Sequence, residues 1–124
     1  MENYFVIPDW PIPEGIQAVS TTRMGGVSQG PFATFNLADD LEEDPNHVKK
    51  NRTLLCQTLN LPTDPIWLTQ VHGTKVKNLD DNQDLSLEYD ASFTTQKDKV
   101  CVVLTADCLP VLFCDSKGTV IGAC

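Results

Sequence analysis

The sequence VCVVLTADCLPVLF, residues 100–113, carries the main signals for both the fold and the candidate site. Its apolar parts are rich in β-branched residues, so they predict two buried strands, Val100–Leu104 and Val111–Cys114. Pro110 lacks a backbone N–H and disfavours helical geometry before it, so we expect a turn or bulge at Cys108. A thiol presented from a bend between buried strands suits a metal ligand or a nucleophile.

The other segments predict a mixed α/β domain. We expect a short edge strand at 4–7, a strand at 16–22, a Gly-rich loop at 24–31, a strand at 66–69 that leads to His72, and a strand at 119–122. Residues 80–84 read as a polar loop that needs no fixed structure. The strand-rich second half favours a central sheet that is buried on both faces.

One helix is well marked in the sequence. Asp44 is a good cap and Pro45 a good first helical residue, so we expect a helix from there to about Asn60. One stripe of this helix carries Val48, Arg52, Leu55 and Leu59. His47 lies in the first turns and is expected to face water, with no functional role.

Composition limits the classes of function. The chain has 124 residues, of which 41% are hydrophobic and 21% charged, as in a globular protein of one domain. Its net charge of −8 argues against a general nucleic-acid binder, which would need Lys and Arg for phosphate contacts. No apolar stretch approaches the roughly 20 residues that span a bilayer. We therefore expect neither a nucleic-acid nor a membrane partner.

The cysteines and the N-terminal residues bear on localisation. Five cysteines without a compact repeating spacing do not suggest a disulfide framework. The first residues lack the basic region and apolar core of a secretory signal. A reducing cytoplasm is therefore the expected compartment. All cysteines except Cys108 are expected to be small buried residues: Cys56, Cys101, Cys114 and Cys124. We also expect Cys124 to lie close to the site.

Several motifs, in order and in register, resemble one protein family. They are TTRMGGVS at 21–28, FNL at 35–37, Asn51-Arg52, QVHG at 70–73 and TADCLP at 105–110. Together they are similar to the N-terminal half of the multicopper polyphenol oxidase family. This is also called the YfiH or laccase-domain family, and it includes the mammalian enzyme FAMIN. The resemblance implies a YfiH-like layered sandwich with a mixed central β-sheet and flanking helices.

The resemblance also implies a metal site. Family members bind zinc through a His of QVHG, a Cys of TADC and a His of a later HAGWRG motif. The first two correspond to His72 and Cys108, which are therefore the expected catalytic and metal-binding residues, with copper as an alternative metal. Two imidazoles and one thiolate would leave a fourth position on zinc open. Asp107 is expected either to orient a ligand or act as a base, or to cap a turn.

The residues before the third ligand motif would be the last ones of this chain. Gly122-Ala123-Cys124 resembles the lead into HAGWRG, and the chain stops inside a predicted strand. We therefore expect residues 1–124 to form a single domain that is the N-terminal part of a longer YfiH-like domain. This chain by itself is then expected to lack a complete metal site, and we expect a monomer or a weak homo-oligomer.

The implied substrates are purine nucleosides and phosphate. Family members phosphorolyse adenosine, inosine and methylthioadenosine, and they deaminate adenosine. Arg23 with Gly25 and Gly26 is the candidate contact for phosphate or ribose, because backbone amides and a guanidinium both bind anions. The alternative is a Gly-rich turn with a solvent-facing Arg. Gln70 is a further candidate for substrate contact.

Other functions stay open at this point. Cys108 and His72 could form a metal-free thiol hydrolase or amidase that edits peptidoglycan precursors. The chain could instead be a non-catalytic metal-binding module. Laccase chemistry is the weakest alternative, because it needs many His ligands and the chain has two. Asn51-Arg52 is expected to be a structural bridge from the helix to a loop rather than a substrate contact.

Overall fold

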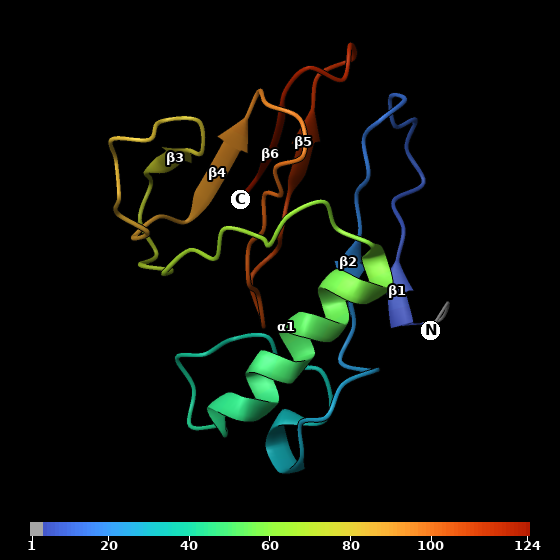
Figure 1. The fold of residues 1–124 in the computed structure, drawn as a ribbon, viewed down its shortest axis with the longest axis vertical. Coiled ribbons are helices and arrows are strands. Elements are labelled where there is room, and N and C mark those ends of the chain that lie inside the picture. The colour runs from blue at the N-terminus through green and yellow to red at the C-terminus, as the bar shows by residue number, and fades with distance from the viewer. Residues whose placement is uncertain (1–3) are drawn as a thin grey trace. The chain divides into compact units, whose positions relative to one another are not determined.

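The computed structural model describes residues 4–124 and forms two compact units, one of residues 4–10 and 17–61, the other of residues 11–16 and 62–124 (Figure 1). The first contains β1 (Phe5–Val6), β2 (Ser20–Thr21), the 3₁₀ turn η2 (Gly30–Phe32) and α1 (Pro45–Leu59). The second contains β3 (Val76–Asn78), β4 (Ala91–Thr94), β5 (Leu112–Cys114) and β6 (Ile121–Ala123). That the two units make up one domain stays a prediction.

Helix α1 begins and ends where the sequence predicts. The Asp44 side chain accepts a hydrogen bond from the Asn46 backbone N–H, which satisfies one of the unpaired donors of the first turn. The helix ends at Asn60 in the left-handed conformation, and the Asn60 N–H bonds back to the carbonyls of Cys56 and Gln57. Its buried face carries Val48, Asn51 and Leu55.

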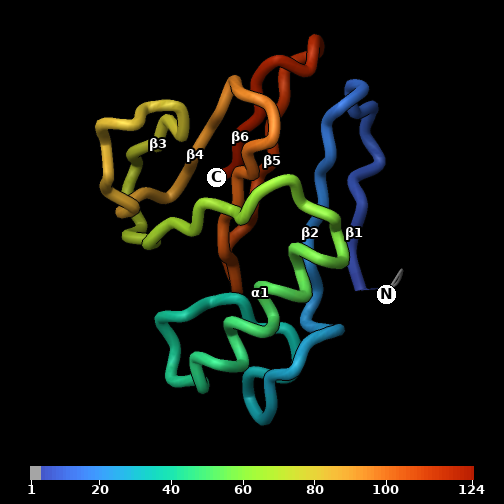
Figure 2. Tube along the Cα trace, viewed as in Figure 1, coloured from blue at the N-terminus to red at the C-terminus, as the bar shows by residue number. Residues whose placement is uncertain are grey.

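The first unit has a small apolar core, next to which the polar residues Ser28 and Asn51 are also buried. Phe35, Leu37, Val48 and Leu55 are buried, and the Phe35 ring meets the Phe5 ring edge to face at 6.4 Å. Strand β1 pairs antiparallel with β2, as expected for a short edge strand, but β2 is shorter than the predicted 16–22 strand. Figure 2 shows the long connection between η2 and α1 curling beside the first turns of the helix.

The second unit is built on a four-stranded mixed sheet in the order β3-β4-β6-β5. Strands β3 and β4 are parallel, whereas β6 is antiparallel to both β4 and β5. The hairpin of β5 and β6 is extended by reciprocal backbone hydrogen bonds between Val111 and Cys124. Figure 2 shows this hairpin in red at the end of the chain. The prediction of a mixed α/β fold with a mixed sheet is therefore confirmed. Within the described residues α1 is the one α-helix, so flanking helices are not seen.

Two predicted strands are wrong. Neither Val100–Leu104 nor Ile66–Thr69 forms a strand, although both segments are half-buried over most of their length. The hydrogen bonds at Val100–Leu104 each involve a side chain. Gln70 donates to the Leu104 carbonyl, and the Cys101 thiol donates to the Ile121 carbonyl. Hydrophobic pattern predicts burial, but a strand also requires a neighbouring backbone to pair with.

The sheet is not buried on both faces, which corrects a second prediction. Strand β4 is almost fully buried, but Val76 of β3 and Phe113 of β5 are each 55% exposed. Residues 105–111 are all exposed, including Leu109. The apolar run at 100–113 is therefore half-buried in its first part and exposed at its bend, rather than buried throughout.

The acidic loop at 80–84 is ordered, contrary to the expectation of a loop without fixed structure. The Asp80 carboxylate accepts hydrogen bonds from the Thr94 hydroxyl, from the Thr95 N–H and hydroxyl, and from Lys99. Asp84 accepts from the Tyr89 hydroxyl, and Lys77 of β3 donates to the Asp84 carbonyl. These bonds join the loop to β3 and β4, so it is part of the sheet's framework.

Asp80 gives a prediction for stability against pH. Burial alone would raise the pKa of this carboxyl, but hydrogen bonds from Thr94, Thr95 and Lys99 outweigh it and lower the pKa from 3.8 to about 2. A depressed carboxyl pKa stabilises the fold above pH 4, and this contribution is lost as the pH falls towards 2. We expect Asp80→Asn to cost about 2 kcal/mol at pH 7.

The measurement is urea unfolding of the wild-type and Asp80→Asn chains at several pH values between 2 and 7. The difference between the two curves should shrink to about 0.5 kcal/mol near pH 2, since the wild-type carboxyl of the folded chain is then about half protonated. Glu88→Gln, at an exposed position of the same loop region, serves as the control and should stay within about 0.5 kcal/mol of wild type. A difference that persists unchanged at pH 2 would contradict the assignment.

No helix in the part of the chain that the structure describes is long and apolar enough to cross a membrane.

Candidate functional site

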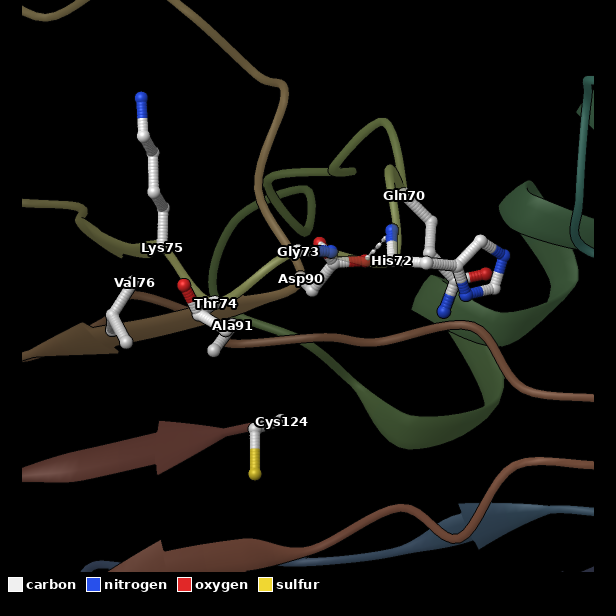
Figure 3. A pocket seen from close by; sticks show the side chains of 9 residues that line it. All are labelled: Gln70, His72, Gly73, Thr74, Lys75, Val76, Asp90, Ala91 and Cys124. Atoms are coloured by element: carbon white, nitrogen blue, oxygen red, sulfur yellow. Dashed lines mark hydrogen bonds between the residues drawn. The ribbon is translucent and has the colours of Figure 1, made fainter.

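A cavity of about 440 Å³ lies in the second unit, at the loop that carries the QVHG motif. Figure 3 shows the side chains that line it: Gln70, His72, Gly73, Thr74, Lys75, Val76, Asp90, Ala91 and Cys124. The lining combines two expected site residues, Gln70 and His72, with a carboxylate, an ammonium group and a thiol. The lining therefore mixes polar side chains with the apolar side chains of Val76 and Ala91.

The His72 loop is held by one carboxylate. Asp90 Oδ1 accepts hydrogen bonds from the N–H groups of Val71 at 3.1 Å and His72 at 2.9 Å, and Asp90 Oδ2 accepts from Gly73 at 2.6 Å. The Gly73 N–H contributes most to holding the pKa of Asp90 below its ordinary value. His72 itself has φ of 57°, in the left-handed region. In Figure 3 the imidazole extends away from the Asp90 carboxylate, on the same side as Gln70.

Gln70 connects this loop to the segment that leads into the TADC motif. Its Nε2 donates to the backbone carbonyl of Leu104 at 3.3 Å, next to Thr105. Residues 70–73 do not form a strand, but Gln70 and His72 line the same cavity. This hydrogen bond joins the first residue of QVHG to the residue that precedes TADCLP.

The expected metal donors fit zinc in kind but not in number. His72 and Cys108 are both exposed, and imidazole and thiolate are preferred zinc ligands. Among residues 4–124, no group of three or more His, Cys, Asp or Glu side chains is placed to hold a metal ion. Cys108 is also absent from the cavity lining. The described residues thus supply two donors of the right chemistry, which is fewer than a zinc site needs.

The other cysteines differ in exposure. Cys124 is exposed, contrary to its expected burial, and it lines the same cavity as His72. Cys56, Cys101 and Cys114 are half-buried. Burial raises the pKa of the Cys101 thiol, which makes this residue a weak nucleophile.

The Gly-rich loop belongs to the first unit, where packing explains its glycines. A Cβ on Gly26 would lie 2.4 Å from both Asn51 Oδ1 and the Thr34 carbonyl oxygen. Gly25 has φ of 104°, and a Cβ there would lie 2.7 Å from the Tyr4 ring. Both positions therefore require glycine for conformation or close approach. A role of these glycines in substrate binding stays a prediction.

Arg23 is exposed but has a structural partner. Its Nε and Nη2 both donate to the Ala33 carbonyl, at 3.0 and 2.8 Å. This fork closes the loop from Arg23 to Ala33 and uses two of the five N–H donors of a guanidinium. Contact of the remaining donors with phosphate or ribose stays a prediction.

Asn51 and Arg52 form the bridge from helix to loop that the sequence predicts. Asn51 is fully buried; its Oδ1 accepts from the Val27 N–H, and its Nδ2 donates to Ser28 Oγ and to the Asn36 carbonyl. Arg52 Nε donates to the Leu37 carbonyl. His47 lies beside Glu43, 3.5 Å from its carboxylate, which gives it a local ion-pair partner rather than a site.

Asp90 is the residue that the sequence reasoning missed. It precedes a strand that was not predicted, β4, and lies 18 residues after His72 in the chain. A lone Asp before a short run such as ASFT is an ordinary turn signal, so nothing local connects it to QVHG. Its importance follows only from the parallel pairing of β3 and β4, which brings the two segments together.

Comparison with known proteins finds one matching family model and relatives that share one name. Residues 17–124 match the model of the family described as multi-copper polyphenol oxidoreductase laccase. The chain is 46% identical over 118 residues to a protein of Shigella flexneri named purine nucleoside phosphorylase YfiH, covering 95% of this chain and 49% of that protein. It is 47% identical over 116 residues to a purine nucleoside phosphorylase of Haemophilus influenzae, covering 94% of this chain and 47% of that one.

Solved structures agree with this assignment. The crystal structure of Neisseria meningitidis protein NMB0706 matches with a TM-score of 0.88 at 40% identity, covering 97% of this chain and 49% of that one. The structure of YlmD from Geobacillus stearothermophilus matches with a TM-score of 0.75 at 26% identity, covering 89% and 44%. The chain spans about half the length of the relatives it matches. It belongs to the multi-copper polyphenol oxidoreductase laccase family, also called the YfiH family.

Proposed function

We propose that this chain forms the N-terminal part of a zinc-dependent purine nucleoside phosphorylase. Its substrates would be adenosine, inosine and methylthioadenosine with phosphate, and it would also deaminate adenosine. The main support is the cavity that His72 and Gln70 both line, with the His72 loop held by Asp90 and Gln70 bonded to the residue before TADC. Relatives named purine nucleoside phosphorylase at 46–47% identity point the same way.

Within this proposal, His72 and Cys108 would hold a zinc ion, with a third ligand from the later motif of the family. A zinc ion bound there would supply a Lewis acid beside the substrate. In phosphorolysis, a phosphate oxygen bonds to the ribose anomeric carbon while the bond from that carbon to the purine nitrogen breaks, and the purine takes up a proton. Gln70 Oε1 is available to accept a hydrogen bond from the nucleoside, because its Nε2 is bonded to Leu104. Asp90 keeps the His72 backbone fixed throughout.

The test compares this chain with the same protein continued to the full length of its relatives. Zinc content is measured by mass spectrometry. The release of adenine, hypoxanthine and ribose 1-phosphate is measured by chromatography, with and without phosphate. We expect stoichiometric zinc and phosphate-dependent base release at full length. Full-length protein with neither zinc nor base release would overturn the proposal; cleavage that persists after chelation of all metal would instead favour the metal-free thiol enzyme.

Arg23 provides a test of the phosphate contact. We expect Arg23→Lys, at full length, to raise the KM for phosphate about tenfold, because one hydrogen bond to a charged group is worth about 1.5–3 kcal/mol. Lys keeps the positive charge but loses the planar fork. The KM for inosine should change much less. Equal phosphate KM values for wild type and variant, with lower stability of the variant, would leave Arg23 a purely structural role.

A further inference from the structure

We propose that Asp90 is a positioning residue, which sets the direction of the His72 imidazole by holding the backbone on which it is carried. This inference rests on the proposed function in that it takes His72 as a metal ligand. It assigns a role to a residue that none of the sequence motifs contains. In this role Asp90 acts through the main chain, by its hydrogen bonds to the N–H groups of residues 71–73.

The first observation is the convergence of three successive amides on one carboxylate. The N–H groups of Val71, His72 and Gly73 all donate to Asp90, at 3.1, 2.9 and 2.6 Å. Successive amides that point to one centre make a small anion-binding concavity. Here the anion is a side chain of the same protein, so the concavity is filled and the three peptide groups are fixed in orientation.

The second observation is the backbone conformation of His72. Its φ of 57° lies in the left-handed region, which residues other than glycine adopt at a conformational cost. Such a conformation persists when surrounding bonds determine it. Because the direction of the Cβ follows from the backbone angles, a relaxed His72 would carry its imidazole in another direction. Figure 3 shows the imidazole and the Asp90 carboxylate on opposite sides of the loop backbone.

The third observation is the attachment of Asp90 to the sheet. It immediately precedes β4, which pairs with both β3 and β6, and Ala91 and Ser92 are 9% and 1% exposed. The carboxylate is therefore held by the most buried strand of the second unit. The loop that carries His72 is exposed, so its hydrogen bonds to Asp90 are what attach its backbone to this strand.

A matched control exists in the same unit. Asp115 accepts hydrogen bonds from the backbone N–H groups of Thr119 and Val120 at the β5–β6 turn. The chemistry is the same, a carboxylate that holds the amides of a turn. The left-handed residue in that turn is Gly118, however, and Asp115 does not line the cavity. Loss of Asp115 should therefore report the structural effect of removing such a carboxylate, without an effect on His72.

The experiment uses the full-length protein with three substitutions: Asp90→Ala, Asp90→Asn and Asp115→Ala. Zinc affinity is measured by competition with a chromophoric chelator, and thermal unfolding is followed alongside. A cobalt-substituted sample gives a visible spectrum that reports on the ligand geometry. If Asp90→Ala does not fold, the isosteric Asp90→Asn carries the test.

We expect Asp90→Ala to weaken zinc binding about 10- to 100-fold, as is usual for residues that orient metal ligands. Asp90→Asn should be intermediate, because one carbonyl oxygen can still accept from the loop. Asp115→Ala should lose stability but keep wild-type zinc affinity and the wild-type cobalt spectrum. Wild-type zinc affinity and spectrum in both Asp90 variants would overturn the inference, whatever their stability. A wild-type protein that binds zinc but cleaves no nucleoside would overturn the proposed function and leave this inference standing. One that binds no zinc would overturn both.

Discussion

We expect replacement of Cys108 or His72 with Ala, at full length, to lower kcat/KM for the proposed inosine phosphorolysis by at least about a thousandfold. A metal ion contributes several kcal/mol to catalysis, and each 1.4 kcal/mol corresponds to a factor of ten in rate. Removal of one of its ligands should remove most of this contribution. The same substitutions should abolish stoichiometric zinc binding. Steady-state kinetics and zinc content of the purified variants provide the measurement.

The chain offers a control for each of these variants. His47 is the other histidine, placed beside Glu43 at the start of α1, so His47→Ala should keep wild-type kcat/KM. Cys114 of β5 is a half-buried thiol, and the Cys114→Ala variant should bind as much zinc as the wild-type protein. Full activity of Cys108→Ala would contradict both the zinc site and the thiol nucleophile. Loss of activity without loss of zinc would favour a direct chemical role for the thiol.

Replacing Asn51 with Ala destabilises the first unit by about 4 kcal/mol. The substitution leaves the Val27 N–H and the Asn36 carbonyl without their partner, and it removes one of the two bonds of the Ser28 hydroxyl, which still donates to Glu43. Each buried group left unsatisfied costs about 1–3 kcal/mol, and Asn51 has no solvent exposure, so water cannot substitute readily. Effects of this size are rare and reveal a buried hydrogen-bond network.

Equilibrium unfolding in urea measures this effect. Gln57 is exposed on the same helix, so Gln57→Ala should change the free energy of unfolding by no more than about 0.5 kcal/mol. A loss below 1 kcal/mol for Asn51→Ala would mean that the network is not what holds the Gly-rich loop.

The same network contains Glu43. Burial alone would raise the pKa of the Glu43 carboxyl, but hydrogen bonds from Ser28 and Asn36 together with the charge of His47 lower it.

The sequence predicted those features that depend on local chemistry. Helix α1 was predicted because the Asp44 cap, Pro45 and the apolar stripe that follows them all act within a few turns of the chain. The β5 strand was found from a short apolar run after Pro110. Strands β3 and β4 were missed, because VKN and ASFT are short and carry no strong alternating pattern. Val100–Leu104 was misread for the opposite reason: it has the composition of a strand but no backbone partner in the described residues.

The candidate site divides in the same way. The sequence by itself determined the family, the motif residues His72 and Cys108, and the structural bridge at Asn51, because residue types in a fixed order carry that information. Only the tertiary structure decided that Asp90 holds the His72 loop, that Gln70 bonds to Leu104, and that Gly26 is required by close packing. These contacts join residues 18 to 34 positions apart, or depend on a clash with a neighbouring element. Such distances are set by how the strands and the helix pack, which no local pattern of residues encodes.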